Sequence, residues 1–96
     1  MSIELQNMTL LQRQIVESLA NDLENLGHIR EFSPAGTSED QLYEALKVLI
    51  ADGIVICYAS SEKELIPVPT PNYTSLSQYW FGLSERGEQL LRAMEV

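Results

Sequence analysis

The chain has 96 residues, of which 45% are apolar, and its 14 acidic and 6 basic residues give a net charge of -8 at pH 7. This length predicts one domain with a modest core, and the apolar share excludes wholesale disorder. The acidic balance predicts weak or unfavourable attraction to the phosphates of nucleic acids, because a basic footprint is the first property expected of a nucleic-acid binder. No apolar run approaches the ~18 residues of a membrane span, so we expect no membrane contact.

Residues that commonly carry chemistry are sparse. Cys57 is the single cysteine, and the sequence shows no signal peptide, which together predict a reduced cytoplasmic protein in which this thiol is a small buried hydrophobe. His28 is the single histidine, so a histidine-based metal cluster is excluded. The sequence contains no Gly-x-Ser-x-Gly, no phosphate-binding glycine loop and no Cys-x-x-Cys. We therefore expect no enzyme, no catalytic residue, no cofactor and no metal.

The N-terminal part predicts an arm followed by a helix. Residues 1–8 have no firm pattern and are expected to form a flexible arm ahead of a domain over 9–96. Thr9 and Gln12 form a capping box, and Gly27 is a plausible C-terminal stop for the helix that begins there. The apolar residues that recur at helical spacing, beginning just before Thr9, are Met8, Leu11, Ile15, Leu19, Leu23 and Leu26.

Residues 22–32 leave two alternatives open. In one, the sequence ENLGHIREF forms a degenerate second helix, although Gly27 in its middle weakens this interpretation. In the other, the first helix runs to Leu26 and residues 29–32 form a short strand. Pro34 and Gly36 predict a turn in either case.

The segment 38–52 predicts a capped amphipathic helix. Ser38 and Gln41 form a second capping box, with Thr37 as a rival N-cap, and Gly53 ends the helix. The residues expected to be buried are Leu42, Ala45, Leu46, Leu49 and Ile50. Residues 54–59 then read as a strand with apolar side chains on both faces, so one face could be covered by a neighbouring element or a partner.

Residues 60–77 form a long polar insert before a return strand at 78–83 and a last helix capped by Ser84. The insert is too long for a tight hairpin turn, and its charged tip is the run from Glu62 to Glu64. Alternating prolines in IPVPTP favour an extended, stiff segment. Tyr79 and Trp80 occupy oppositely facing strand positions, and we expect Trp80 to be the one that points into the core.

Two stretches, LYEALKVLIADGIV at 42–55 and YWFGLSERGEQLLRAM at 79–94, resemble the winged helix-turn-helix superfamily. The resemblance covers roughly residues 9–94. It implies an α+β fold in which helices pack with a small antiparallel wing sheet, with a long wing insert at 60–77. It also implies that 38–52 is the recognition helix and that the fold docks on DNA.

The residue types on the outward face of helix 38–52 favour a different function. Carboxylates predominate on this face and at the wing tip, where DNA-binding members present cationic or amide side chains to bases and phosphates. We therefore expect a small acidic regulatory or adaptor module that binds a protein partner, possibly a basic one, and forms a homodimer. The residues expected to make these contacts are Glu39, Asp40, Tyr43, Glu44 and Lys47 on the helix, and Ile66, Val68 and Tyr73 in the insert.

The alternative is a dimeric transcription regulator that places the same helix in the major groove. Arg30, Lys47 and Lys63 would then carry the phosphate or base contacts. Three cations are few for a specific site, so any DNA binding is expected to be weak.

Overall fold

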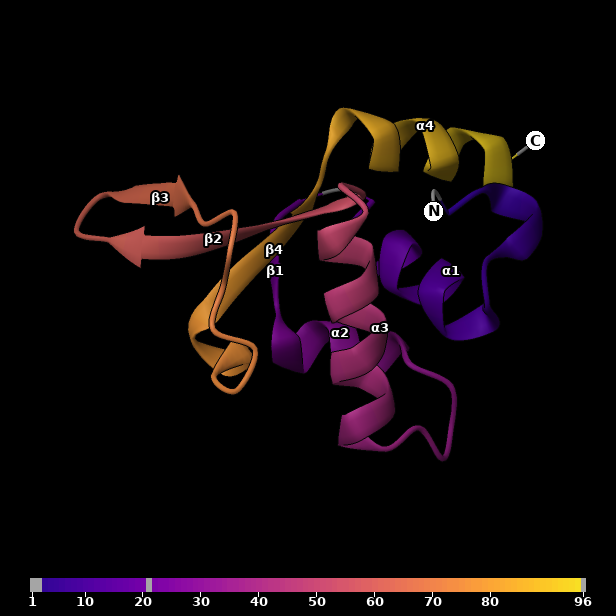
Figure 1. The fold of residues 1–96 in the computed structure, drawn as a ribbon, viewed down its shortest axis with the longest axis horizontal. Coiled ribbons are helices and arrows are strands. Elements are labelled where there is room, and N and C mark those ends of the chain that lie inside the picture. The colour runs from indigo at the N-terminus through magenta and orange to yellow at the C-terminus, as the bar shows by residue number, and fades with distance from the viewer. Residues whose placement is uncertain (1–2, 21, 96) are drawn as a thin grey trace.

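A computed structural model describes residues 3–20 and 22–95 and shows helices packed against one end of a small antiparallel sheet (Figure 1). In chain order the elements are the 3₁₀ turn η1 (Leu5–Asn7), α1 (Leu10–Ser18), β1 (Glu24–Asn25), α2 (Leu26–Phe32), α3 (Glu39–Ala51), β2 (Val55–Ser61), β3 (Glu64–Pro67), the 3₁₀ turn η2 (Leu76–Gln78), β4 (Tyr79–Leu83) and α4 (Glu85–Met94). The strand order is β1-β4-β2-β3, and each neighbouring pair is antiparallel. The α+β class expected from the sequence is confirmed.

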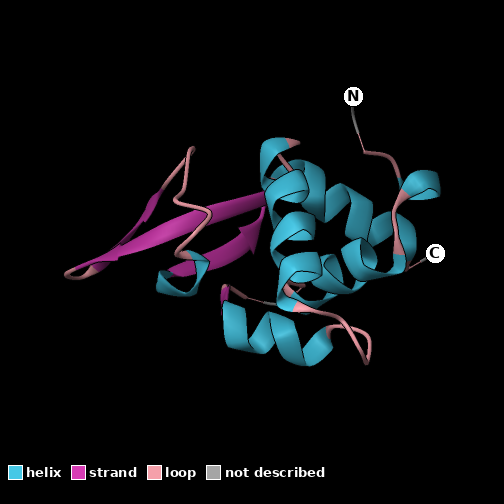
Figure 2. Cartoon of the chain, turned by 60° about the horizontal axis from the view of Figure 1, so that its bottom comes forward, coloured by secondary structure: helices cyan, strands magenta, loops and turns pink. Residues whose placement is uncertain are grey.

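The core lies between the helices and one face of the sheet, which we call the inner face. Alternate residues of β2 and β4 point inward, and Val55, Cys57 and Phe81 are buried there. Figure 2 shows the helices gathered on one side, with the β2–β3 hairpin projecting away from them. The most completely buried side chains are Ile15, Val16, Ile29, Leu42, Leu46, Leu49, Ile54, Val55, Cys57, Leu76 and Phe81.

The predicted helix 38–52 is confirmed as α3 with its caps. The Ser38 hydroxyl accepts from the Gln41 backbone N–H at 3.1 Å, and the Gln41 side chain accepts from the Ser38 N–H at 2.9 Å. Leu42, Leu46 and Leu49 are buried, as the spacing predicts. At the other end Gly53 has a φ of +76°, a conformation that side-chain-bearing residues seldom adopt, so the chain turns directly into β2.

The first helix is shorter than predicted, and of the two alternatives for residues 22–32 the structure shows the second helix. α1 ends at Ser18, whose hydroxyl donates to the Ile15 carbonyl at 2.6 Å. Leu26 is buried as predicted, but it belongs to α2, where the Asn25 side chain caps the helix by accepting from the N–H of His28. The alternative with a strand at 29–32 is therefore wrong, and Gly27 lies inside α2 rather than ending α1.

The N-terminal segment packs onto the domain instead of leaving it as an arm. Within the described part of 1–8, Met8 is buried in the core and the Ile3 N–H donates to the Asp52 carboxylate at 2.7 Å. The domain boundary expected at residue 9 therefore falls inside the packed structure, while residues 1–2 lie outside the described residues.

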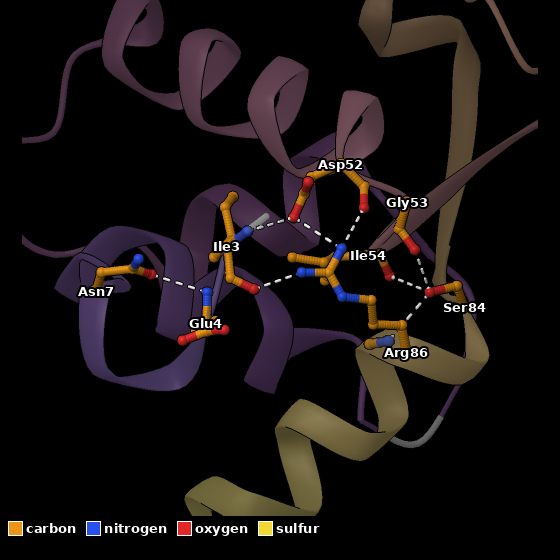
Figure 3. Close-up of polar contacts among 9 residues, drawn as sticks. Ile3, Glu4, Asn7, Asp52, Gly53, Ile54, Ser84 and Arg86 are labelled. Atoms are coloured by element: carbon orange, nitrogen blue, oxygen red, sulfur yellow. Dashed lines mark hydrogen bonds and ion pairs between the residues drawn. The ribbon is translucent and has the colours of Figure 1, made fainter. Parts of the chain in front are cut away.

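A polar junction joins this N-terminal segment to the end of α3 and the start of α4 (Figure 3). The Arg86 guanidinium pairs with the Asp52 carboxylate at 2.8 Å and also donates to the backbone carbonyls of Asp52 and Ile3. The Ser84 hydroxyl donates to the Gly53 carbonyl. Hydrogen bonding from Ile3, then from Arg86, lowers the pKa of Asp52 below its ordinary value of 3.8, although burial opposes this shift.

The predicted insert contains a tight hairpin and an extra strand. Glu62 and Lys63 form a two-residue turn between β2 and β3, with Glu62 at a φ of +47°, so the expectation that the insert contains no tight hairpin turn is wrong. The chain then crosses back beside α3 (Figure 1) and enters η2, where Leu76 is buried, before β4 pairs with the other side of β2.

The prolines of the insert have positions that suit an edge strand. The Val68 N–H donates to the Cys57 carbonyl at 2.8 Å, so the N–H groups of residues 66 and 68 face β2. The backbone nitrogens of residues 65, 67 and 69 consequently point away from β2, toward the outer edge. Because two of these are Pro67 and Pro69, the outer edge of β3 lacks the regular row of donors that another strand would need.

Trp80 is on the outer face of the sheet, opposite to the prediction. Tyr58 and Trp80 are direct cross-strand partners, and Trp80 is 37% exposed. Phe81 takes the buried position next to it, and Tyr79 is half-buried on the inner side. Apolar residues on both faces of β4 gave the sequence no means of telling which face would meet the helices.

Candidate functional site

The outward face of α3 is acidic, as the sequence predicted. Asp40, Glu44 and Lys47 are exposed on the side opposite the buried leucines. Glu39 is also exposed, and its carboxylate accepts from the Arg30 guanidinium at 2.8 Å. Exposed pairs of this kind contribute little to stability, but they leave less positive charge to attract an anionic partner. The exposed face therefore presents two carboxylates not engaged in a described ion pair, Asp40 and Glu44, against the single cation Lys47.

One flank of α3 is covered by the returning insert. Tyr73 packs against the core cluster, and the Lys47 ammonium lies 5.8 Å from the centre of the Tyr73 ring, within range of a cation–π contact. Tyr43 is half-buried and packs against the same cluster. The structure thus brings Tyr73 and Lys47 together within one chain, so this part of the insert covers its own domain. Ile66, on β3, stays exposed, whereas Val68 is half-buried.

The other flank of α3 carries a groove that the sequence did not reveal. It has a volume of about 570 Å³ and runs between the start of α1 and α3. Leu10 is 61% exposed at this groove, because it points away from the apolar stripe that buries α1. Its orientation off the stripe is the signal that could have identified it. The residues that line the groove are Thr9, Leu10, Leu11, Gln12, Pro34, Thr37, Gln41, Glu44, Ala45 and Val48.

The three cations of the DNA-binding alternative do not form a basic stripe. Arg30 on α2 is paired with Glu39, and Lys47 on α3 lies beside Tyr73. Lys63 is in the β2–β3 turn, which projects away from the helices, and it is flanked in sequence by Glu62 and Glu64. In the part of the chain that the structure describes, these three cations therefore form no continuous positive surface beside α3.

The remaining chemistry of the described residues is limited. Cys57 is buried as expected, and this burial raises the pKa of its thiol to about 11, so it stays a neutral thiol. Among residues 3–20 and 22–95, no three or more His, Cys, Asp or Glu side chains are arranged to hold a metal ion. No helix within the same ranges has both the length and the apolar character needed to cross a bilayer.

Comparison with models of protein families, with curated protein sequences and with solved structures finds no match for this chain.

Proposed function

We propose that the domain is a winged helix. α3 runs directly into β2, and β4 runs directly into α4, as the resemblance of the two quoted stretches implies. β2 and β4 pair over five positions, which supports reading them as the two strands of the wing. The β2–β3 hairpin is then an addition to that wing, since β3 pairs with the opposite edge of β2.

We further propose that the domain is a regulatory or adaptor module that binds a protein rather than DNA. The observation that carries this proposal is the charge of the α3 face, where Asp40 and Glu44 are exposed and Arg30 is already paired with Glu39. Carboxylates in this position repel a phosphate backbone but complement a basic protein surface, where they steer association and favour the correct partner.

The groove beside α3 supplies the apolar part of such a contact. Protein interfaces combine an apolar centre with a polar rim, and Leu10 and Val48 provide the first while Glu44 and Gln41 provide the second. The groove is shallow and open to solvent, a shape on which the apolar side chains of an amphipathic segment from a partner can rest. The contact surface we propose is therefore this groove together with the acidic face of α3.

A capture experiment from extracts of the native host tests this surface. Wild-type protein is compared with Asp40→Asn/Glu44→Gln, and with Leu10→Ser, which removes exposed apolar surface from the groove. Both variants should lose the partner that wild type retains, and added salt should weaken capture by wild type. Glu17→Gln/Glu88→Gln is the matched control, because it removes the same charge from exposed positions on α1 and α4.

Two results would count against the proposal. One is capture that the α3 and groove variants leave unchanged. The other is capture that a nuclease abolishes, which would point instead to the DNA-binding alternative.

A homodimer stays a prediction. Tyr73 and Val68 are packed or half-buried within their own chain, so Ile66 on β3 is the predicted contact residue of the insert that is left exposed for a second copy. Sedimentation velocity of wild type and Ile66→Ser tests this contact, and identical sedimentation of the two proteins would exclude it.

A further inference from the structure

The outer face of the sheet carries an aromatic and aliphatic surface that is partly open to solvent. Tyr58 and Trp80 stand opposite each other on neighbouring strands, and Leu65 lies beyond them on β3. Gly82 makes room for this surface, since a Cβ there would lie 2.3 Å from the Leu23 side chain. Leu23 therefore packs directly over the strand, beside Trp80.

A hollow of about 430 Å³ lies on this face between Trp80 and the β2–β3 hairpin. Leu23, Leu65 and Trp80 form its apolar walls, with Trp80 37% and Leu65 38% exposed. The other residues that line it are Asp22, Ser60, Glu62, Lys63 and Glu64. The rim thus brings together three carboxylates and one ammonium group. In the described part of the chain none of these four charged groups forms an ion pair.

The combination of an exposed indole and an excess of carboxylates identifies the chemistry of the occupant. An aromatic face attracts a cation, and an indole does so most strongly. A guanidinium group fits better than an ammonium group, because it is planar, stacks on a ring and donates to a carboxylate through two N–H groups at once. A nucleic acid or a second copy of this chain would meet repulsion from the same rim, since each copy has a net charge of -8.

The backbone limits how a partner can approach this hollow. The neighbouring edge of β3 offers the Leu65 N–H outward but has Pro67 at the next outward position, so an added strand would lack regular pairing. Recognition must therefore come from side chains that enter the hollow.

We propose that this hollow binds an arginine side chain from a basic segment of a partner protein, with the guanidinium against the Trp80 indole and the carboxylates of Asp22, Glu62 and Glu64 around it. The site is on the sheet, separate from the α3 face and its groove, and the two can be tested independently.

Tryptophan fluorescence, excited at wavelengths that the four tyrosines do not absorb, reports on this site, because Trp80 is the single tryptophan. The probe is the peptide acetyl-Gly-Arg-Gly-Arg-Gly-amide, and the control is the same peptide with citrulline, a neutral analogue of arginine, at both arginine positions. We expect a saturable change in Trp80 emission with the arginine peptide, with a dissociation constant on the order of 1 mM or below at low salt. The citrulline peptide should cause no saturable change.

Charge variants separate this site from a general attraction to the acidic protein. Glu62→Gln/Glu64→Gln should lower the affinity for the arginine peptide by about 3- to 10-fold, because it removes two rim carboxylates. Asp40→Asn/Glu44→Gln removes the same charge from α3 and should change the affinity by less than about twofold. Trp80→Leu should also bind the arginine peptide more weakly than wild type, because the indole is removed while an apolar side chain remains. The anisotropy of a fluorescein-labelled peptide measures this affinity.

Equal binding of the citrulline peptide would overturn the proposal, as would equal weakening by the two double variants. Unchanged affinity in Trp80→Leu would also overturn it. None of these results would bear on the α3 face, which has its own variants and its own readout.

Discussion

The helical half of the molecule and the β2–β3 hairpin differ in the contacts that stabilise them. In the helical half, Leu46 and Ile29 are wholly buried, helices are capped by side chains, and the Asp52–Arg86 junction joins segments that are far apart in sequence. In the hairpin, Leu65 and Ile66 are exposed, and three charged residues follow one another at its tip, Glu62 and Lys63 in the turn and Glu64 at the start of β3. Most of the stabilising contacts are therefore in the helical half. The hairpin leaves apolar side chains exposed to solvent, which is typical of an interaction surface.

The largest expected effect separates these two regions directly. Leu46→Ala should lower the free energy of unfolding by about 2–5 kcal/mol, because it leaves a cavity in the core. Leu65→Ala, the same change on the hairpin, should cost less than about 1 kcal/mol. Urea denaturation of both variants measures the difference. Similar losses in the two would mean that the hairpin is part of the stabilising core.

A glycine pair sharpens the comparison at the junction. A Cβ at Gly87 would lie 2.3 Å from the Ile54 carbonyl oxygen, so Gly87→Ala should cost about 1–3 kcal/mol through a backbone shift. Gly27→Ala is the control, since its nearest neighbour would be 3.4 Å away and alanine favours a helix, which predicts a gain of up to about 1 kcal/mol. Thermal melts that move in the same direction for both variants would contradict this account.

The junction also predicts a pH dependence. The folded-state pKa of Asp52 is lowered, so the ionised carboxylate stabilises the fold above its ordinary pKa of 3.8, and this contribution is lost as pH falls through the folded-state value. Asp52→Asn should cost about 1–2 kcal/mol at neutral pH, and its difference from wild type should shrink between about pH 5 and pH 2. A difference that stays constant over that range would remove Asp52 from the pH response.

The smallest effect on stability is expected at the hairpin edge, where association should change instead. Pro67→Thr adds an outward N–H to β3 and should increase self-association with little change in unfolding free energy. Ser61→Thr is the control, because it introduces the same side chain in the hairpin at a β2 position that pairs with Glu64 and leaves the outer edge of β3 unchanged. Sedimentation velocity at several concentrations measures this, and equal behaviour of the two variants would show that the prolines do not protect the edge.

The local parts of the fold were predictable from the sequence. α3 follows from signals within about four residues of one another, namely the Ser38–Gln41 capping box and the spacing of its leucines. Its acidic outward face follows from the same spacing. Tyr73 and Lys47 were both named as contact residues, but they are 26 positions apart in the sequence, and nothing local indicated that they pair within one chain.

The features that the sequence predicted wrongly or did not reveal depend on contacts between residues far apart in the chain. Leu19 and Leu26 keep a helical spacing although they lie on either side of a break between two helices, so periodicity alone joined them. The N-terminal segment is positioned by Asp52 and Arg86, which no local pattern links to Ile3. The hollow beside Trp80 depends on which face of β4 meets the helices, and the hairpin turn at Glu62 lacks the glycine or asparagine that usually announces one.

Binding to duplex DNA is the most direct test of the claim that the acidic α3 face serves a protein partner. In an anisotropy titration of random duplex at about 150 mM salt, ordinary DNA binders associate with dissociation constants of about 10⁻⁴–10⁻⁶ M. We predict no saturable binding within that range, because exposed Asp40 and Glu44 oppose the phosphates and Arg30 is held by Glu39. Micromolar binding that weakens steeply with added salt would contradict the account and favour the DNA-binding alternative.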